Sequence, residues 1–294
     1  MVKDKDKNKT KTESLRHSIQ TLWTIATNSF VTGFLKGKIY TGPLKNLCVP
    51  GMNCYSCPGA LGSCPIGALQ SVIGDSHYHM AFYVVGFLML VGAICGRFVC
   101  GWLCPFGLFQ DLLHKIPFVK KIKTFKGDRI LRKLKFVILT LFVIILPMCV
   151  SDIVGIGDPW FCKYICPVGT LEGGIPLVIL NEGLRQTIGF LYTWKITILA
   201  ILIILSVIIY RPFCKYLCPL GAIYGAFNKI SAVGLHCDKS KCVSCGKCQR
   251  VCKMDVYPAK EPESAECIRC GLCVKECPVS ALNMGLKNKE NSNS

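Results

Sequence analysis

Two runs of cysteines near the C-terminus constrain this chain more than any other feature of its sequence. The first run has the spacing Cys-x2-Cys-x2-Cys-x3-Cys over residues 242–252, and the second repeats it over 267–277. Few apolar side chains surround these runs, so bound metal centres must supply much of the cohesion of this segment. The spacing is typical of two 4Fe–4S clusters in which the fourth cysteine of each run ligates the other cluster. Zinc is the alternative, but zinc sites do not need eight cysteines in this order.

The spacing therefore predicts two ligand sets in this segment. The first set is Cys242, Cys245, Cys248 and Cys277, and the second is Cys252, Cys267, Cys270 and Cys273.

A second pattern, Cys-x3-Cys-Pro-x-Gly, occurs three times earlier in the chain. It begins at Cys100, Cys162 and Cys214, and a partial copy begins at Cys64. Cysteines at positions i and i+4 project from the same side of one helical turn, and the proline then ends that geometry. Because a 4Fe–4S cluster takes four thiolates, two such turns supply one complete ligand set. We expect an inner cluster on Cys100, Cys104, Cys214 and Cys218; free buried thiols would explain one pair but hardly three matched copies.

Six other cysteines are candidates for an outer site: Cys48, Cys54, Cys57, Cys64, Cys162 and Cys166. In one arrangement Cys162 and Cys166 join two of the four earlier cysteines. In a rival arrangement the four earlier cysteines form a site of their own, and Cys162 and Cys166 remain a dithiol. Disulfides are a third option, because an outer compartment can be oxidising. We therefore expect one or two further 4Fe–4S clusters beyond the two at the C-terminus.

Long apolar stretches separate the copies of the second pattern. Apolar residues make up 51% of the chain, and 35 Lys and Arg outnumber 17 Asp and Glu. About 20 apolar residues cross a hydrocarbon core of about 30 Å. The sequence thus predicts four membrane spans, at about residues 18–35, 80–99, 136–154 and 191–210. Basic residues are concentrated between the second and third spans, so the positive-inside rule places that loop and both termini in the cytoplasm.

The predicted fold is a membrane all-α protein of the cell membrane. It consists of a four-helix transmembrane bundle of two parallel repeats, followed by a small α+β domain that binds two clusters. The predicted parts are a disordered basic tail at 1–17, the bundle at 18–229, the two-cluster domain at 230–287 and a second tail at 288–294.

With both patterns present, the chain resembles the membrane-bound iron–sulfur proteins of the NapH and NosR type. The resemblance rests on residues 96–105, on residues 211–225 and on the C-terminal runs. It implies a cytoplasmic two-cluster ferredoxin domain, a bundle with Cys-x3-Cys-Pro turns, and electron transfer at the membrane, often linked to quinol oxidation. The chain departs from NapH in its cysteines between 48 and 57 and in the pair Cys162 and Cys166.

We therefore predict a membrane iron–sulfur protein that passes electrons from a cytoplasmic donor, through its ferredoxin clusters and the bundle centres, toward an outer acceptor. The expected partners are the lipid bilayer and redox proteins on the cytoplasmic side, with an outer redox protein as a further option. One alternative is a quinol or quinone oxidoreductase subunit, in which His77 and His79 hydrogen-bond a quinone, although such histidines are more often interfacial polar residues. A maturation or regulatory protein for a partner metalloenzyme is another alternative, and whether the chain is itself an enzyme stays open. The basic loop is expected to meet anionic headgroups rather than nucleic acid.

Overall fold

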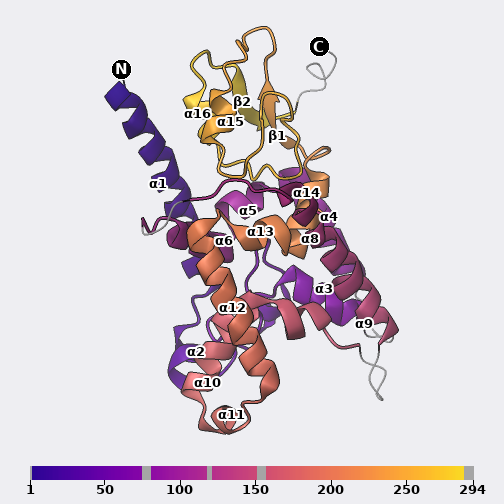
Figure 1. Cartoon of the computed structure of the whole chain (residues 1–294). Helices are drawn as coiled ribbons and strands as arrows, with labels where there is room; N and C mark the ends of the chain where they lie inside the picture. The colour runs from indigo at the N-terminus through magenta and orange to yellow at the C-terminus, as the bar shows by residue number, and fades with distance from the viewer. Residues whose placement is uncertain (1, 75–80, 118–120, 151–156, 288–294) are drawn as a thin grey trace.

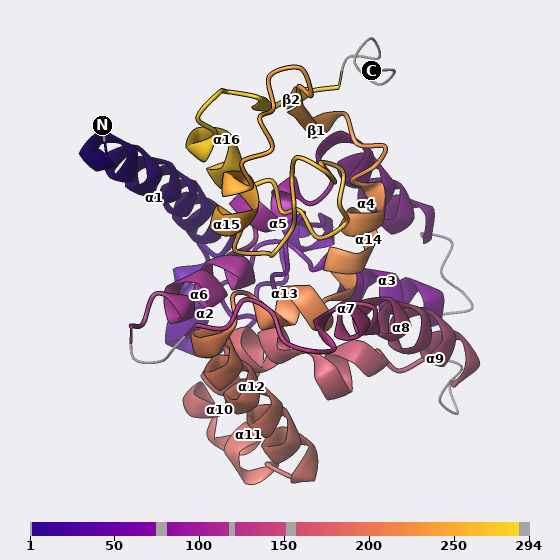
Figure 2. The same cartoon turned by 45° about the horizontal axis from the view of Figure 1, so that its top comes forward.

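The computed structural model describes residues 2–74, 81–117, 121–150 and 157–287. This part of the chain is mostly helical, with one small sheet at one end of the molecule (Figure 1). The sheet and its two short helices lie on one side of the helical part, and helix α12 (Phe190–Ile208) extends away from them. Figure 2 shows the same arrangement with the C-terminal segment turned toward the viewer.

Each copy of the Cys-x3-Cys-Pro pattern forms two short helices that are separated at its second cysteine. In each complete pair the second helix begins with the proline that follows the cysteine, because proline at the first helical position needs no hydrogen-bond acceptor for an N–H group. These helices are α5 (Phe98–Trp102), α6 (Pro105–His114), α13 (Pro212–Tyr216) and α14 (Pro219–Phe227). The partial copy at Cys64 leads into α3 (Pro65–Gly74), and the copy at Cys162 forms the π-helical segments η3 (Phe161–Ile165) and η4 (Gly169–Gly174).

The remaining helices of the described residues surround these turns. They are α1 (Val2–Thr27), α2 (Val31–Lys36), the 3-10 helix η1 (Pro43–Asn46), α4 (Ala81–Cys95), α7 (Asp128–Leu131), α8 (Leu134–Ile138), the π-helical segment η2 (Leu139–Ile145), α9 (Leu146–Cys149), α10 (Ile175–Leu180) and α11 (Glu182–Gln186).

The C-terminal segment closes on itself through two antiparallel strands. Strand β1 (Val233–Cys237) pairs with β2 (Leu282–Leu286). Between them lie the short helices α15 (Lys247–Val251) and α16 (Leu272–Glu276), whose cysteines share a small core with the strands. The segment also packs on the helical part, because Ile268 belongs to the same buried cluster as Cys100 and Cys104.

The prediction of a four-helix transmembrane bundle is wrong. Among the residues that the structure describes, α12 is the one helix long and apolar enough to cross a membrane, and it coincides with the fourth predicted span. Helix α4, in the second predicted span, has 15 residues. At 1.5 Å per residue it is only about 22 Å long, and it ends before Gly96, whose φ of +51° is left-handed.

The other two predicted spans are interrupted. The third is divided among α8, η2 and α9 within the described residues, and Pro147 lies in the last of these. The first falls on α1 and α2, with a break after Thr27. Residues 12–17, predicted to belong to a disordered tail, are instead helical. Apolar composition alone therefore overestimated the lengths of these helices.

Candidate metal centres

The inner candidate site consists of two cysteine turns that are far apart in the sequence. Cys100 and Cys104 flank the α5–α6 junction, Cys214 and Cys218 flank the α13–α14 junction, and all four are buried. Burial, together with the neighbouring sulfurs of Cys214 and Cys100, raises the pKa of Cys104 to about 12. The same causes raise the pKa of Cys218. The structure thus brings together the four cysteines that were predicted to form the inner site.

Two buried arginines link the two cysteine turns, one arginine from each turn. Each arginine stands three residues before the first cysteine of its own turn and donates to the backbone of the other turn. Arg97 Nη2 donates to the carbonyl oxygen of Cys214 at 3.0 Å, and Arg211 Nη1 donates to the carbonyl oxygen of Cys100 at 2.5 Å. The glycine of each pattern makes room for this, because a Cβ there would lie 3.1–3.2 Å from a guanidinium nitrogen. Two positive charges are therefore fixed beside the four sulfurs.

A glutamine also contacts the inner sulfurs. Gln110 stands six residues after Cys104, and its Nε2 donates to Cys214 Sγ at 3.2 Å. Its Oε1 accepts a hydrogen bond from the backbone N of Phe213 at 3.2 Å. Hydrogen bonds to ligand sulfurs orient the ligands and influence the potential of a cluster.

The outer candidate site repeats this arrangement with other residues. Gln70 stands six residues after Cys64; its Nε2 donates to Cys162 Sγ at 3.2 Å, and its Oε1 accepts from Phe161 N at 2.9 Å. Burial and the neighbouring Cys54 sulfur raise the pKa of Cys162 to about 11. The pKa of Cys166 is raised well above its ordinary value by burial and by the sulfurs of Cys162, Cys54 and Cys64.

Four of the six outer cysteines lie close to one another in the fold. Cys54, Cys64, Cys162 and Cys166 lie together, which favours the arrangement in which the later pair joins two earlier cysteines. Burial raises the pKa of Cys48 to about 11, and the backbone of Cys48 pairs with Ser63, the residue before Cys64. Cys57 neighbours the set through Cys54.

Two glycines and the carboxylate of Glu172 complete the outer site. A Cβ on Gly169 would lie 3.6 Å from Cys54 Sγ, and one on Gly67 would lie 3.8 Å from Cys162 Sγ. Glu172 Oε2 accepts a hydrogen bond from Cys54 N at 2.7 Å, and burial raises its pKa to about 7.

The two C-terminal runs form two neighbouring sets with exchanged fourth members. One pocket is lined by residues that include all four cysteines of the first set, Cys242, Cys245, Cys248 and Cys277. In the second set, burial and the sulfurs of Cys270 and Cys252 raise the pKa of Cys267 to about 11. Cys273 lies near the other three sulfurs of its set and near Cys248 of the first set.

The second C-terminal set lies directly on the inner site. Trp102 Nε1 donates to the carbonyl oxygen of Arg269 at 3.0 Å. A Cβ on Gly101 would lie 2.3 Å from the carbonyl oxygen of Ile268, so the two backbones approach as closely as glycine allows. The segment that carries Cys267 and Cys270 therefore rests on the turn that carries Cys100.

The donor sets fit 4Fe–4S clusters. Among the described residues, no three His, Cys, Asp or Glu side chains are placed to hold a single metal ion. A 4Fe–4S cluster is instead surrounded by four thiolates, one on each iron. Buried polar atoms without a partner lie beside the sets, namely Arg97 Nε and both side-chain polar atoms of Asn53, the neighbour of Cys54. Since such atoms almost always have a partner in a native fold, they fit a polar group bound between the cysteines.

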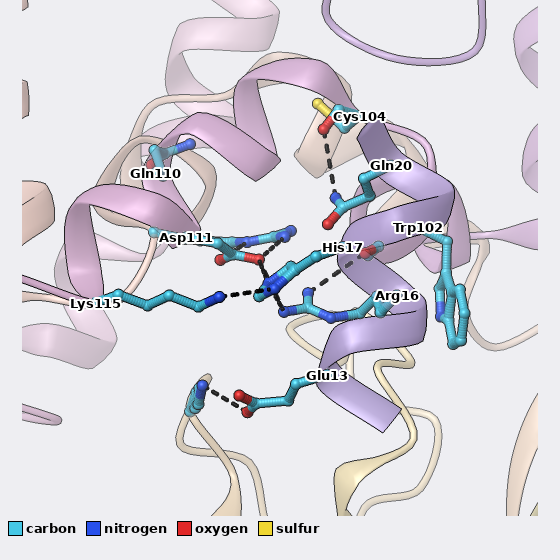
Figure 3. Close-up of polar contacts among 12 residues, drawn as sticks. Glu13, Arg16, His17, Gln20, Trp102, Cys104, Gln110, Asp111 and Lys115 are labelled. Carbon is cyan, nitrogen blue, oxygen red and sulfur yellow. Dashed lines mark hydrogen bonds and ion pairs between the residues drawn. The ribbon is translucent and has the colours of Figure 1, made fainter. Parts of the chain in front are cut away.

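A buried ionic cluster lies beside Cys104 and joins three helices (Figure 3). The Asp111 carboxylate lies 2.6 Å from Arg211 Nη2 and 2.9 Å from Arg16 Nη2. His17 Nε2 lies 3.6 Å from the same carboxylate. Burial by itself would raise the pKa of Asp111, but Arg211 holds it well below its usual range.

The sequence analysis missed the arginines and glutamines of these sites. Their signal was a fixed position in the pattern, with Arg97 and Arg211 three residues before a first cysteine and Gln70 and Gln110 six residues after a second one. The quinone candidates His77 and His79 lie outside the described residues.

Comparisons with known proteins agree with an iron–sulfur assignment. A family described as a 4Fe–4S binding domain matches residues 76–126, 136–175 and 192–235, and a second family with the same description matches 263–283. An uncharacterized protein of Methanocaldococcus jannaschii is 28% identical over 63% of this chain and 62% of its own length.

Two named relatives are similar at the same level. The methylamine utilization ferredoxin-type protein MauN of Methylorubrum extorquens is 27% identical over 58% of this chain and 52% of its own length. The ferredoxin-type protein NapH of Haemophilus influenzae is 28% identical over 56% and 50%. The chain thus spans about half to three fifths of the length of these relatives. No solved structure is significantly similar to it.

Proposed function

Because this chain belongs to the NapH- and NosR-like family of ferredoxin-type 4Fe–4S proteins, we propose that it conducts electrons between a cytoplasmic donor and an outer acceptor. The 4Fe–4S family matches and the ferredoxin-type relatives support an iron–sulfur electron carrier. In the proposal, residues 230–287 are the ferredoxin domain and hold two clusters on the crossed sets of cysteines. The inner and outer sites hold one cluster each, on Cys100, Cys104, Cys214 and Cys218 and on Cys54, Cys64, Cys162 and Cys166.

The observation that carries this proposal is that the four cysteine sets follow one another in contact. Cys245 of the first C-terminal set is exposed and gives a donor protein access. Cys248 and Cys273 bring the two C-terminal sets together, and the second set rests on the inner site. Bound clusters supply one-electron redox centres, while this chain fixes their spacing, their ligands and the hydrogen bonds to the sulfurs.

Helix α12 supports a route across a membrane. Near its start, Lys195 Nζ donates to the carbonyl oxygen of Cys162, an outer ligand, at 3.1 Å. Near its end, the carbonyl oxygen of Ser206 lies 3.3 Å from Nδ1 of His114 on α6, the helix that follows Cys104. Nineteen residues span about 28 Å, which is close to the thickness of a hydrocarbon core. Because residues 195 and 206 are eleven positions apart, these two contacts lie about 16 Å apart along α12, which therefore runs beside both the outer and the inner site.

The exposed surface of α12 supports a lipid partner. Only 17% of its most apolar stretch is buried, and the side chains of Ile201 and Ile204 are 52% and 61% exposed. Contact of such a surface with water is unfavourable, whereas lipid removes that cost. We infer that α12 attaches the protein to the membrane.

Iron counting combined with vectorial electron transfer tests the proposed function. After anaerobic purification we expect about sixteen irons per chain, and about twelve in Cys104→Ala, because each cluster carries four irons. In vesicles, Cys104→Ala should keep reducible ferredoxin clusters but fail to reduce an impermeant acceptor on the far side. The control is Cys149→Ala, since Cys149 is exposed on α9, away from the four sets. Transfer by Cys104→Ala at the normal rate would contradict the proposal.

A second candidate function, electron exchange with a quinone, is favoured by a cavity on α1. The cavity is lined by Glu13, Ser14, His17, Ser18, Thr21, Leu22 and Lys115. Its His17 contacts the ionic cluster of Figure 3, and Gln20 Nε2 on the same helix donates to the carbonyl oxygen of Cys104 at 3.4 Å. In this alternative, a quinol added to purified protein should reduce the clusters, and His17→Ala should abolish that reduction without loss of iron.

A further inference from the structure

We propose that Met52 is a positioning residue that connects the inner and outer sites and provides the electronic coupling between them. The inference rests on the proposed function, because it assumes that both sites hold clusters. It assigns a role to a residue outside the cysteine patterns, on the loop between Cys48 and Cys54.

The loop passes between the two sites at very short range. A Cβ on Gly51 would lie 3.1 Å from Cα of Cys104, so the loop backbone lies against the inner turn. The backbone N–H of Met52 lies close enough to the sulfur of Cys104 to lower the pKa of that thiol. On the other side, Met52 Sδ lies 3.9 Å from Cys64 Sγ of the outer set. Met52 therefore contacts one ligand of each site, and it is only 2% exposed.

These contacts form a short path between two ligand sulfurs. From Cys104 the path crosses to the nearby backbone N–H of Met52, follows the bonds of that single residue and ends at a sulfur–sulfur contact with Cys64. Electronic coupling decays more slowly along bonds and hydrogen bonds than across empty space, and the thioether is polarizable. The exchange moves one electron: the centre that releases it is oxidised, the centre that receives it is reduced, and no bond forms or breaks. Met52 itself is neither oxidised nor reduced.

Tyr224 fixes the position of the loop that carries Met52. Its hydroxyl donates to the carbonyl oxygen of Pro50 at 3.1 Å, and its side chain is completely buried. The sulfurs of Cys100 and Cys104 on one side and of Cys64 on the other are near enough to affect its hydroxyl. Tyr224 stands six residues after Cys218, where the turns of Cys64 and Cys104 carry a glutamine that contacts a sulfur, whereas Tyr224 contacts the loop.

The test compares Met52→Leu with Met148→Leu in the full-length protein. Leucine keeps the backbone N–H and nearly the volume of methionine but has no sulfur. Met148 is the matched control, because it lies on α9 and is 63% exposed. Three quantities are measured: iron per chain, the magnetic interaction between the two reduced sites by EPR, and the rate of electron exchange between them after rapid reduction. We expect Met52→Leu to keep its iron, to weaken the magnetic interaction and to slow exchange by about tenfold or more.

Unchanged interaction and exchange in Met52→Leu with full iron content would overturn the inference. If Met52→Leu loses iron, Tyr224→Phe decides, since it removes only the hydrogen bond to Pro50. A full iron content with weaker interaction in Tyr224→Phe supports the inference, and wild-type behaviour overturns it. Wild-type protein with only about eight irons would overturn the proposed function together with this inference, so the two failures can be told apart.

Discussion

Single side chains distinguish the inner site from the outer one. Gln110 and Gln70 occupy the same position in their turns and donate to Cys214 and Cys162 respectively. The inner site also has two buried arginines, whereas the outer site has Lys195 and the half-buried Glu172. The same cysteine pattern is therefore placed in two different electrostatic environments.

The glutamines give a prediction with an internal control. Removing a hydrogen bond from a ligand sulfur destabilises the more negative, reduced state, so the potential of that cluster falls. Gln110→Leu should lower the potential of the inner cluster alone, and Gln70→Leu that of the outer cluster alone. Redox titration followed by EPR measures both potentials. Equal shifts of both clusters in either variant would show that the two glutamines do not act locally.

At the scale of elements, the ionic cluster of Figure 3 ties three helices together. Asp111 on α6 binds Arg16 of α1 and Arg211 next to α13, and all three side chains are at most 2% exposed. Breaking a buried ion pair from one side leaves an unpaired buried charge, which is strongly destabilising.

We expect Asp111→Asn to lower the free energy of unfolding by about 3–5 kcal/mol, measured by denaturant unfolding. Asp158→Asn is the control, because its pair with Lys163 is exposed and such pairs contribute at most about 1 kcal/mol. A loss in Asp111→Asn no larger than in this control would contradict the prediction.

The ion pairs of Asp111 also predict that the free energy of unfolding depends on pH. The pKa of Asp111 is lower in the folded chain than in the unfolded chain, so its contribution is fully present above the unfolded value of about 3.9. It is lost progressively as the pH falls below that value toward the folded pKa. The stability difference between wild type and Asp111→Asn should therefore shrink below about pH 4. A difference that grows on acidification would contradict this assignment.

At the scale of the whole molecule, one exposed apolar helix extends away from a compact set of cysteine turns (Figure 1). If α12 lies in lipid, charges on its exposed face should release the protein from the membrane. Each lysine near the centre of a membrane helix costs about 2.5–3.5 kcal/mol. The double variant Ile201→Lys with Ile204→Lys should therefore move to the soluble fraction with its iron retained.

The control for this fractionation is Ile230→Lys, at an exposed apolar position outside α12. It should leave the protein in the membrane fraction. Membrane retention of the double variant would contradict attachment through α12.

Features that depend only on neighbours along the chain could be predicted from the sequence. The cysteine spacing over 242–252 and 267–277 predicted 4Fe–4S binding, which the family match over 263–283 confirms for the second run, and the fourth predicted apolar span became α12. Both are local properties, since ligand spacing within a turn and the apolarity of one helix need no distant contact. The four-span bundle failed because hydropathy does not show where Gly96 or Pro147 interrupts regular helical structure.

The grouping of the cysteines and the residues around them depend instead on how the whole chain folds. The selection of Cys54 over Cys48, the reciprocal hydrogen bonds of Arg97 and Arg211, and the position of Met52 between two sites all depend on the close approach of distant segments. Arg97 and Cys214, for example, are 117 residues apart in the chain and 3.0 Å apart in the fold. Such contacts arise from packing and charge compensation over the whole molecule, and no spacing rule within a single segment contains them.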